Sequence, residues 1–297
     1  MKHSRIIIIG FGPAGMACAI QLKRMGLTPI VIEKSRPGGM LSNANLIENY
    51  LGFPKGIPGS KLAEIFREQA YNYNINAIKD DINVVRYSNN TFYLNGNSDE
   101  YTCDKLVIAS GTSPKWPENL PPGLIHAGLI HADIALLGQI SSKSIGIIGA
   151  GDAAFDYALS LAQRGNSVMI FNRGTKVKAL LRLQEKVSNA NYISYFENYS
   201  LENARISDGK MLSLSFKENM QEHEFMVDYL IFATGRIPAL NFLDPEMNDK
   251  LDALQEDHRL YMIGDVKNGI FRQLSLAVGD GIKAAMDIYN HESNHPD

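Results

Sequence analysis

Cysteine is scarce in this sequence. The 297 residues include two cysteines, Cys18 and Cys103, which lie far apart in the chain. They form neither a Cys-x-x-Cys motif nor the framework of a disulfide-rich domain. This usage is typical of a reducing compartment, so we expect a cytoplasmic protein. It also excludes chemistry in which two neighbouring thiols carry electrons between sites.

Several other features are missing as well. The formal net charge is −3, which excludes the basic footprint of a nucleic-acid-binding protein. No apolar run approaches the roughly 20 residues of a membrane helix. The polar start 1–5 leads directly into an apolar run, so we expect neither a membrane anchor nor a signal peptide. No cluster with metal-ligand spacing is visible, and we expect no metal. The length suits about two globular domains.

A glycine-rich turn stands near the start of the chain. The sequence Gly10-Phe11-Gly12-Pro13-Ala14-Gly15 follows the apolar run 6–9, which reads as a buried strand. A helical segment over 14–25 and a second apolar strand over 28–32 come next, ending at Glu33. This order of strand, turn, helix, strand and acid predicts a dinucleotide site. The pyrophosphate would lie at the helix N-terminus and Glu33 would bind ribose hydroxyls.

A second turn of this kind lies in the middle of the chain. The sequence Gly149-Ala150-Gly151-Asp152-Ala153-Ala154 follows an apolar strand over 144–148, and we expect a helix over 156–164 and a strand over 168–171. The residues after that strand carry no acid but include Asn172, Arg173, Lys176 and Lys178. Cations here favour the 2′-phosphate of NADP over the 2′-hydroxyl of NAD. We therefore expect NADPH, with NADH or a site that no longer binds a nucleotide as alternatives.

Two stretches show the alternating pattern of antiparallel strands. They cover 79–94 and 201–226, with turn signals at Asn89-Asn90 and Asp208-Gly209. We expect each to form a β-rich excursion from its domain.

Taken in order, these residues resemble the low-molecular-weight thioredoxin reductases over nearly the whole chain. The stretches that carry the resemblance are 10–15, 37–41, 48–54, 109–112, 233–238, 263–265 and 272–275. The resemblance implies an α/β protein with two Rossmann-like three-layer dinucleotide-binding domains. The FAD domain would be discontinuous, at 1–113 and 237–297, with the NAD(P) domain inserted at 114–236. It also implies a homodimer.

The resemblance further implies which residues hold each nucleotide. Those expected at FAD are Gly10, Gly12, Pro13, Ala14, Gly15, Glu33, Lys34, Gly39, Met40, Leu41, Asn49, Ile82, Ser110, Gly111, Gly264, Asp265, Arg272, Gln273 and Leu274. Those expected at NAD(P) are Gly149, Gly151, Asp152, Ala153, Ala154, Asn172, Arg173, Lys178, Gly235 and Arg236. A helix beginning near Gln273 would present N–H donors to the flavin pyrimidine, where they stabilise reduced flavin.

The sequence departs from the resembled family where the redox disulfide would lie. Counting back from Gly149 places Ala132 and Ala135 at the positions of that family's Cys-x-x-Cys. Neither residue can carry a thiol, so the internal disulfide relay is absent. Histidines titrate near neutral pH and can transfer protons. The catalytic candidates in this segment are His126, His131 and Asp133, against an interpretation of the segment as a solvated connection.

The sequence therefore predicts an FAD-dependent NAD(P)H oxidoreductase that is not a true thioredoxin reductase. Hydride would pass from NAD(P)H to flavin, and electrons would then leave to an external acceptor such as ferredoxin, flavodoxin, a quinone or a small molecule. The cysteine-free ferredoxin–NADP reductases of thioredoxin-reductase type share this layout. Two alternatives stay open. One is a flavoprotein that takes electrons from a protein donor with little use of nicotinamide, and the other is a non-catalytic FAD-binding protein.

Overall fold

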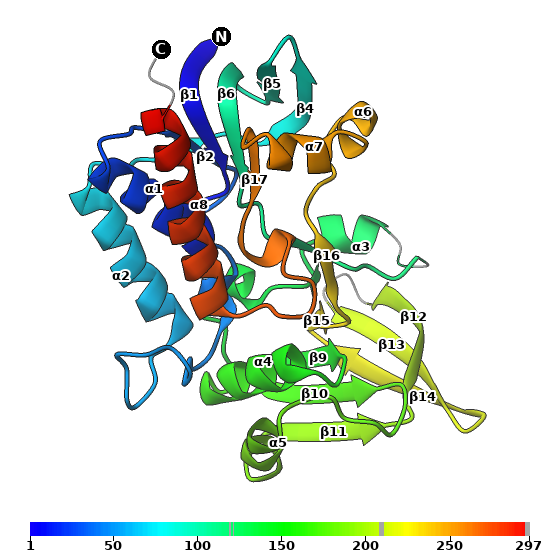
Figure 1. Cartoon of the computed structure of the whole chain (residues 1–297). Helices are drawn as coiled ribbons and strands as arrows, with labels where there is room; N and C mark the ends of the chain where they lie inside the picture. The colour runs from blue at the N-terminus through cyan, green and yellow to red at the C-terminus, as the bar shows by residue number, and fades with distance from the viewer. Residues whose placement is uncertain (119, 121, 208–210, 295–297) are drawn as a thin grey trace. The chain divides into compact units, whose positions relative to one another are not determined.

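The chain divides into two compact units in the computed structural model, which describes residues 1–118, 120, 122–207 and 211–294. Unit 1 comprises Met1–Ser42, Glu48–Ser113 and Ile237–Asp297, and unit 2 comprises Asn43–Ile47 and Pro114–Arg236. Figure 1 labels their helices and strands. Apart from the short segment Asn43–Ile47, the chain passes from one unit to the other in the strands β7 (Thr112–Pro114) and β16 (Arg236–Pro238), which pair with each other.

A seven-stranded sheet forms the centre of unit 1, in the order β3-β2-β1-β6-β5-β4, with β17 also paired to β6. The strands are β1 (Lys2–Ile9), β2 (Ile30–Glu33), β3 (Ile78–Lys79), β4 (Ile82–Ser88), β5 (Thr91–Gly96), β6 (Glu100–Ile108) and β17 (Leu260–Met262). The long strand β6 runs parallel to β1 throughout. Its first half pairs antiparallel with β5 and its second half parallel with β17. One strand therefore joins the nucleotide-binding sheet to the predicted β-rich excursion.

Two hydrophobic clusters cover the faces of this sheet. Ile6 and Ile8 of β1 belong to the cluster on the side of α1 (Pro13–Arg24) and α8 (Leu274–Asn294), which Figure 1 shows side by side. The alternate residues of β1 belong to the second cluster, together with residues from the β4–β5 hairpin and from α6 (Pro245–Asn248) and α7 (Leu251–Glu256). Helix α2 (Gly59–Asn72) and two short 3-10 helices, η1 (Gly39–Asn43) and η3 (Gly264–Val266), complete unit 1.

Helices α1 and α8 approach each other very closely at a glycine. A Cβ atom on Gly281 would lie 2.3 Å from the carbonyl oxygen of Ala14 and 2.9 Å from the backbone nitrogen of Cys18. Only glycine allows this separation, so the sequence fixes how α8 packs on the first helix of the fold.

Unit 2 is built around a parallel sheet in the order β11-β10-β9-β15-β8. Its strands are β8 (Ile130–His131), β9 (Ser144–Ile148), β10 (Ser167–Asn172), β11 (Ile193–Glu197) and β15 (Tyr229–Phe232). One hydrophobic cluster joins this sheet to α4 (Asp152–Gln163) and α5 (Leu181–Ser188). A second cluster joins it to an antiparallel layer, in which Phe171 of β10 stacks on Phe216 with ring centroids 4.1 Å apart. The short helices α3 (Pro122–His126) and η2 (Ile134–Leu137) lie near β8 in the sequence.

The predicted β-rich excursions are confirmed. Asn89 and Asn90 connect β4 to β5 with φ angles of 50° and 59°, as a two-residue type I′ turn requires. In unit 2, the antiparallel layer consists of β12 (Ser200–Ser207), β13 (Met211–Glu218) and β14 (Gln221–Val227). Its second turn, at Asn219 and Met220, also has positive φ angles. The predicted turn at Asp208-Gly209 falls outside the described residues.

Each unit thus has three layers: helices, a mainly parallel sheet and antiparallel strands. The expected fold class, α/β with two Rossmann-like three-layer domains, is confirmed. None of the helices within the described ranges is long and apolar enough to cross a membrane.

Candidate functional site

The first fingerprint folds into a tight turn between β1 and α1. Gly10 has a φ of +100°, and a Cβ atom there would lie 2.4 Å from the carbonyl oxygen of Ala109. A Cβ atom on Gly15 would lie 2.1 Å from the carbonyl oxygen of Gly10. Both positions therefore require glycine for the helix to pack against the strands.

Gly12 has a different environment. It is the N-cap residue of α1, and within the described part of the chain no side chain caps this helix. The nearest atom to a Cβ on Gly12 would be the Cα of Gly39, at 3.9 Å, so the backbone is open here. Open backbone at an uncapped helix N-terminus is what a pyrophosphate needs. The local geometry fits the pyrophosphate of FAD.

Glu33 lies beside this turn at the end of β2. Its Oε2 atom accepts a hydrogen bond from the backbone N–H of Phe11 at 2.7 Å. Its Oε1 atom accepts from the backbone N–H and the hydroxyl of Ser35, at 2.9 and 3.0 Å. The side chain is buried, with 8% exposure. These contacts fix the carboxylate at the strand end, the position predicted for a ribose-binding acid.

Distant segments meet the first turn. The backbone N–H of Gly38 donates to the carbonyl of Phe11 at 2.8 Å, which places η1 next to the fingerprint. Gly264 has a φ of +73°, and a Cβ atom there would lie 2.8 Å from that of Ala14. The structure therefore gathers the predicted FAD residues near positions 10–15, 39–41 and 264–265 into one region of unit 1.

Two of the residues predicted near the flavin, Asn49 and Gln273, form a hydrogen bond with each other, whereas a third, Ile82, lies in a different hydrophobic cluster from the first fingerprint. The side-chain amide of Asn49 donates to Oε1 of Gln273 at 2.8 Å, across 224 residues of sequence. Gln273 directly precedes α8, so the predicted helix start is confirmed. Ile82, by contrast, is buried in the cluster that contains alternate residues of β1 and not in the cluster of Phe11 and Ala14. Of the remaining predicted FAD residues, Lys34 is exposed and Ser110 donates its hydroxyl to the carbonyl of Ala239 at 2.7 Å.

The second fingerprint repeats the geometry of the first. Gly149 has a φ of +135°, and a Cβ atom there would lie 2.5 Å from the carbonyl oxygen of Ala233. Gly151 is the N-cap of α4, and a Cβ atom on it would meet nothing within 4 Å. Ala154 is fully buried at the fingerprint's third position. This turn fits a second dinucleotide for the same physical reasons.

Asn172, the last residue of β10, has a structural role in the loop that follows, which the sequence did not predict. The Asn172 amide donates to the hydroxyl of Tyr195 at 2.9 Å and to the carbonyl of Lys176 at 3.3 Å, and its side chain is buried. Asn172 therefore shapes the loop. Arg173, Lys176 and Lys178 are exposed on it, which leaves three cations available to a phosphate. Contact of these residues with a nucleotide stays a prediction.

Most of the chain matches a known family. A family model described as pyridine nucleotide-disulphide oxidoreductase matches residues 4–281. The chain belongs to this family. It is 29% identical to a thioredoxin reductase of Chlamydia pneumoniae, over 97% of this chain and 98% of that protein. It is 27% identical to a glucosaminate ammonia-lyase of Pseudomonas fluorescens, over 97% of this chain and 95% of that protein.

Solved structures agree with the family assignment. The Lactococcus lactis thioredoxin reductase in its FR conformation superposes with a TM-score of 0.85 and 25% identity, covering 98% of this chain and 99% of that one. The Staphylococcus aureus bacillithiol disulfide reductase Bdr (YpdA) superposes with a TM-score of 0.74 and 17% identity, covering 98% and 100%, and so shares the fold. The predicted resemblance to thioredoxin reductases is confirmed. Family membership supports an FAD-dependent NAD(P)H oxidoreductase in general terms.

The cysteines of this family member cannot form a disulfide pair in the fold. Cys18 and Cys103 are both fully buried, and they belong to the clusters on opposite faces of the unit 1 sheet. Burial raises the pKa of Cys18 to about 12 and also raises the pKa of Cys103, so both remain thiols at neutral pH. A buried, protonated thiol is chemically inert.

Ala132 and Ala135, which the sequence analysis places where the resembled family carries its redox cysteines, lie in unit 2. Ala132 is buried, and the backbone N–H of Ala135 donates to Oδ1 of Asn43 at 2.8 Å. The Asp133 carboxylate forms an ion pair with Arg236 at 2.9 Å. Nε2 of His131 lies 2.8 Å from the carbonyl oxygen of Gly128. These contacts hold the segment 131–135 in place as a polar connection.

His126 ends the short helix α3 and is exposed. The structure gives it no described hydrogen bond to either of the other two candidates in this segment. A catalytic role for His126, His131 and Asp133 stays a prediction.

A half-buried acid on α4, Asp156, has a contact that the sequence analysis missed. Oδ2 of Asp156 on α4 accepts a hydrogen bond from the backbone N–H of Asn45 at 2.7 Å. Burial raises the pKa of Asp156 to about 6, although this backbone hydrogen bond opposes the shift. The two residues are 111 positions apart, so no local pattern signals the contact.

Proposed function

We propose that this protein takes hydride from NADPH onto bound FAD and passes the electrons to an acceptor outside the chain, without a protein disulfide between them. FAD supplies the redox chemistry when bound, since flavins accept hydride and release electrons singly or in pairs. The chain supplies two binding turns and the dipoles around them. Two observations support the proposal: both dinucleotide-binding fingerprints are complete, and both cysteines are buried and inert.

The residues of unit 1 have separate tasks in this proposal. The N-terminus of α1 at Gly12 binds the pyrophosphate, and Glu33 binds the ribose of the adenosine. The N-terminus of α8, just after Gln273, directs its N–H groups and positive dipole end toward the flavin pyrimidine. This arrangement stabilises negative charge on the reduced ring.

Unit 2 selects and holds the nicotinamide nucleotide. The N-terminus of α4 at Gly151 binds the pyrophosphate of NADPH. Arg173 and Lys178 bind its 2′-phosphate, with charge-assisted hydrogen bonds that NADH cannot make. Asn172 fixes the loop that carries both cations.

The acceptor is external because the two cysteines are buried in separate clusters and cannot form a disulfide that relays electrons. Its chemical identity is open among ferredoxin, flavodoxin, quinones and small disulfides. Relatives of similar identity are named for different reactions, as the thioredoxin reductase and the ammonia-lyase illustrate. We further propose that the protein acts as a homodimer.

An anaerobic experiment tests the first half of the proposal. The flavin-loaded protein is mixed with NADPH or NADH, and the flavin absorbance is followed by stopped flow. We expect rapid bleaching by NADPH and slower or weaker bleaching by NADH, followed by reoxidation when a suitable acceptor is added. If neither nucleotide bleaches a flavin that dithionite reduces, the proposal fails. A protein electron donor or a non-catalytic role would then replace it.

A further inference from the structure

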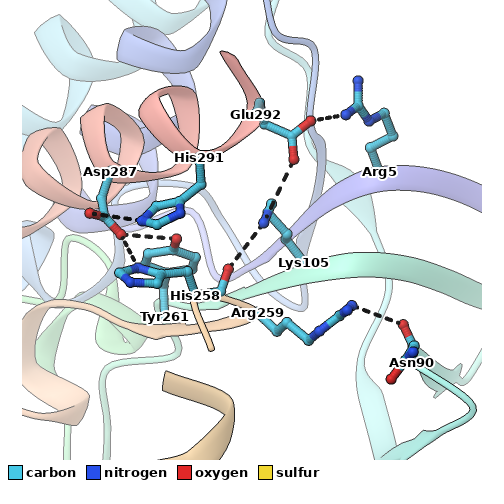
Figure 2. A network of polar contacts seen from close by, with 9 residues as sticks. All are labelled: Arg5, Asn90, Lys105, His258, Arg259, Tyr261, Asp287, His291 and Glu292. Carbon is cyan, nitrogen blue, oxygen red and sulfur yellow. Dashed lines mark hydrogen bonds and ion pairs between the residues drawn. The ribbon is translucent and has the colours of Figure 1, made fainter. Parts of the chain in front are cut away.

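Three potential metal ligands meet in unit 1, at the end of α8 and in the turn before β17. They are His258, Asp287 and His291 (Figure 2). One nitrogen of each imidazole and one carboxylate oxygen lie within 4.8 Å of one another. The sequence predicted no metal-ligand cluster. No sequence pattern signals this group, because 29 residues separate His258 from Asp287 and the fold brings them together.

The geometry of the cluster is that of two imidazoles sharing one carboxylate. Nδ1 of His258 lies 2.7 Å from Oδ2 of Asp287, and Nε2 of His291 lies 3.9 Å from Oδ1 of the same carboxylate. Asp287 and His291 are four residues apart on α8 and so share a face of the helix. The two imidazole rings stack with centroids 3.6 Å apart. The result is a compact set of two nitrogen ligands and one oxygen ligand.

Neighbouring groups hold this set in place. The hydroxyl of Tyr261 donates to Oδ2 of Asp287 at 3.0 Å, and Nζ of Lys105 donates to the carbonyl oxygen of His258 at 3.2 Å. Lys105 also pairs with Glu292 at 3.7 Å, so its positive charge is partly compensated. Outer contacts of this kind orient the ligands of metal sites.

The three side chains are accessible, with exposures of 38% for His258, 39% for Asp287 and 35% for His291. An ion can therefore enter, and the side chains have room to adjust.

We propose that His258, Asp287 and His291 bind one Zn²⁺ ion per chain. Zinc accepts imidazole nitrogen and carboxylate oxygen at about 2.0–2.2 Å in tetrahedral geometry, which places ligand atoms about 3.3 Å apart. To bind one ion, the two imidazole rings must turn out of their stacked arrangement so that a nitrogen of each points at it, and water fills the fourth position. The ion joins α8 to the turn before β17 and so stabilises unit 1.

The test is a zinc titration of the full chain, purified without a polyhistidine tag and stripped with a chelator. Calorimetry or competition with a chromophoric chelator measures stoichiometry and affinity. We expect one Zn²⁺ per chain, with affinity reduced roughly tenfold or more in each of His258→Gln, Asp287→Asn and His291→Gln. The matched control is His3→Gln, since Nδ1 of His3 contacts Thr102 and lies outside the cluster. Its affinity should equal that of the wild type.

Two further readouts keep the proposal falsifiable if one variant folds poorly. Co²⁺ in place of Zn²⁺ should give the intense visible bands of tetrahedral coordination, and Zn²⁺ should raise the thermal midpoint of the wild type but not of Asp287→Asn. Absence of stoichiometric binding overturns the proposal. So does binding that the three substitutions leave unchanged or that His3→Gln weakens equally. None of these readouts depends on flavin reduction.

Discussion

The carboxylate of Asp156 accepts a hydrogen bond from the backbone N–H of Asn45 at 2.7 Å, although 111 residues of sequence separate them. A second contact, from the backbone N–H of Ala135 to Oδ1 of Asn43 at 2.8 Å, fixes the same segment. These two hydrogen bonds explain why Asn43–Ile47 groups with unit 2 although unit 1 flanks it in the chain. Asp156 therefore anchors the segment Asn43–Ile47 to unit 2, and its ionisation should affect the stability of the fold.

The stability of the protein should depend on pH through Asp156. Burial raises its folded-state pKa to about 6, above the usual value for Asp. A raised pKa means that the stabilisation is present at low pH and is lost as pH rises through 6. Asp156→Asn keeps an acceptor oxygen without the charge. The free energy of unfolding of this variant, relative to wild type, should increase by about 2 kcal/mol between pH 4.5 and 7.5 in denaturant titrations. An equal difference at both pH values would contradict the prediction.

Gly149→Ala should be much more destabilising than Gly165→Ala. Both glycines have positive φ, at +135° and +81°, but only the Cβ on Gly149 would meet another atom, the carbonyl oxygen of Ala233 at 2.5 Å. Gly165→Ala should cost about 1–2 kcal/mol from backbone strain alone. Gly149→Ala should cost about 3 kcal/mol or more, as measured by chemical unfolding. Equal costs would mean that the close approach in the second fingerprint is wrong.

A cysteine-free variant should keep the activity. Cys18 and Cys103 are buried on opposite faces of the unit 1 sheet and are protonated at neutral pH. The double variant Cys18→Ala/Cys103→Ala should therefore reduce its flavin with NADPH at a rate within about twofold of wild type. In parallel, Ellman's reagent should find no reactive thiol in the native wild type and both thiols after denaturation. Loss of flavin reduction in a folded, flavin-loaded variant would contradict the account.

Exposed cations of unit 2 should determine the choice of nicotinamide nucleotide. Arg173→Ala/Lys178→Ala should raise the KM for NADPH by about tenfold or more, since each charged hydrogen bond contributes about 1.5–3 kcal/mol. The KM for NADH should change little. Lys217→Ala is the matched control, because Lys217 is also an exposed cation of unit 2 but lies on β13. A similar effect on both nucleotides would argue against a 2′-phosphate site.

Local patterns predicted local structure well. The helix expected at 14–25 is α1 at Pro13–Arg24, and the Asn89-Asn90 turn closes a hairpin with the required positive φ angles. The helix expected at 156–164 begins earlier, at Asp152, because Gly151 serves as its N-cap. These features depend on a few neighbouring residues, which is why spacing and turn chemistry were enough.

Contacts between distant segments could not be predicted in the same way. The hydrogen bond between Asn49 and Gln273 spans 224 residues, and the one between His258 and Asp287 spans 29. Both depend on where the sheet and α8 place their ends, which the sequence pattern leaves open. The internal role of Asn172 was missed for a related reason, since its partner Tyr195 comes from the next strand of the sheet.

The electron capacity of the protein tests the central claim most directly. The flavin-loaded wild type is titrated anaerobically with dithionite and, separately, with NADPH, while the flavin absorbance reports the reduction. A reductase with a redox-active disulfide takes up about four electrons per flavin, whereas a flavin alone takes up about two. The account predicts about two electrons per flavin from dithionite and complete bleaching by NADPH. An uptake of about four, or a flavin that NADPH leaves oxidised, would contradict it.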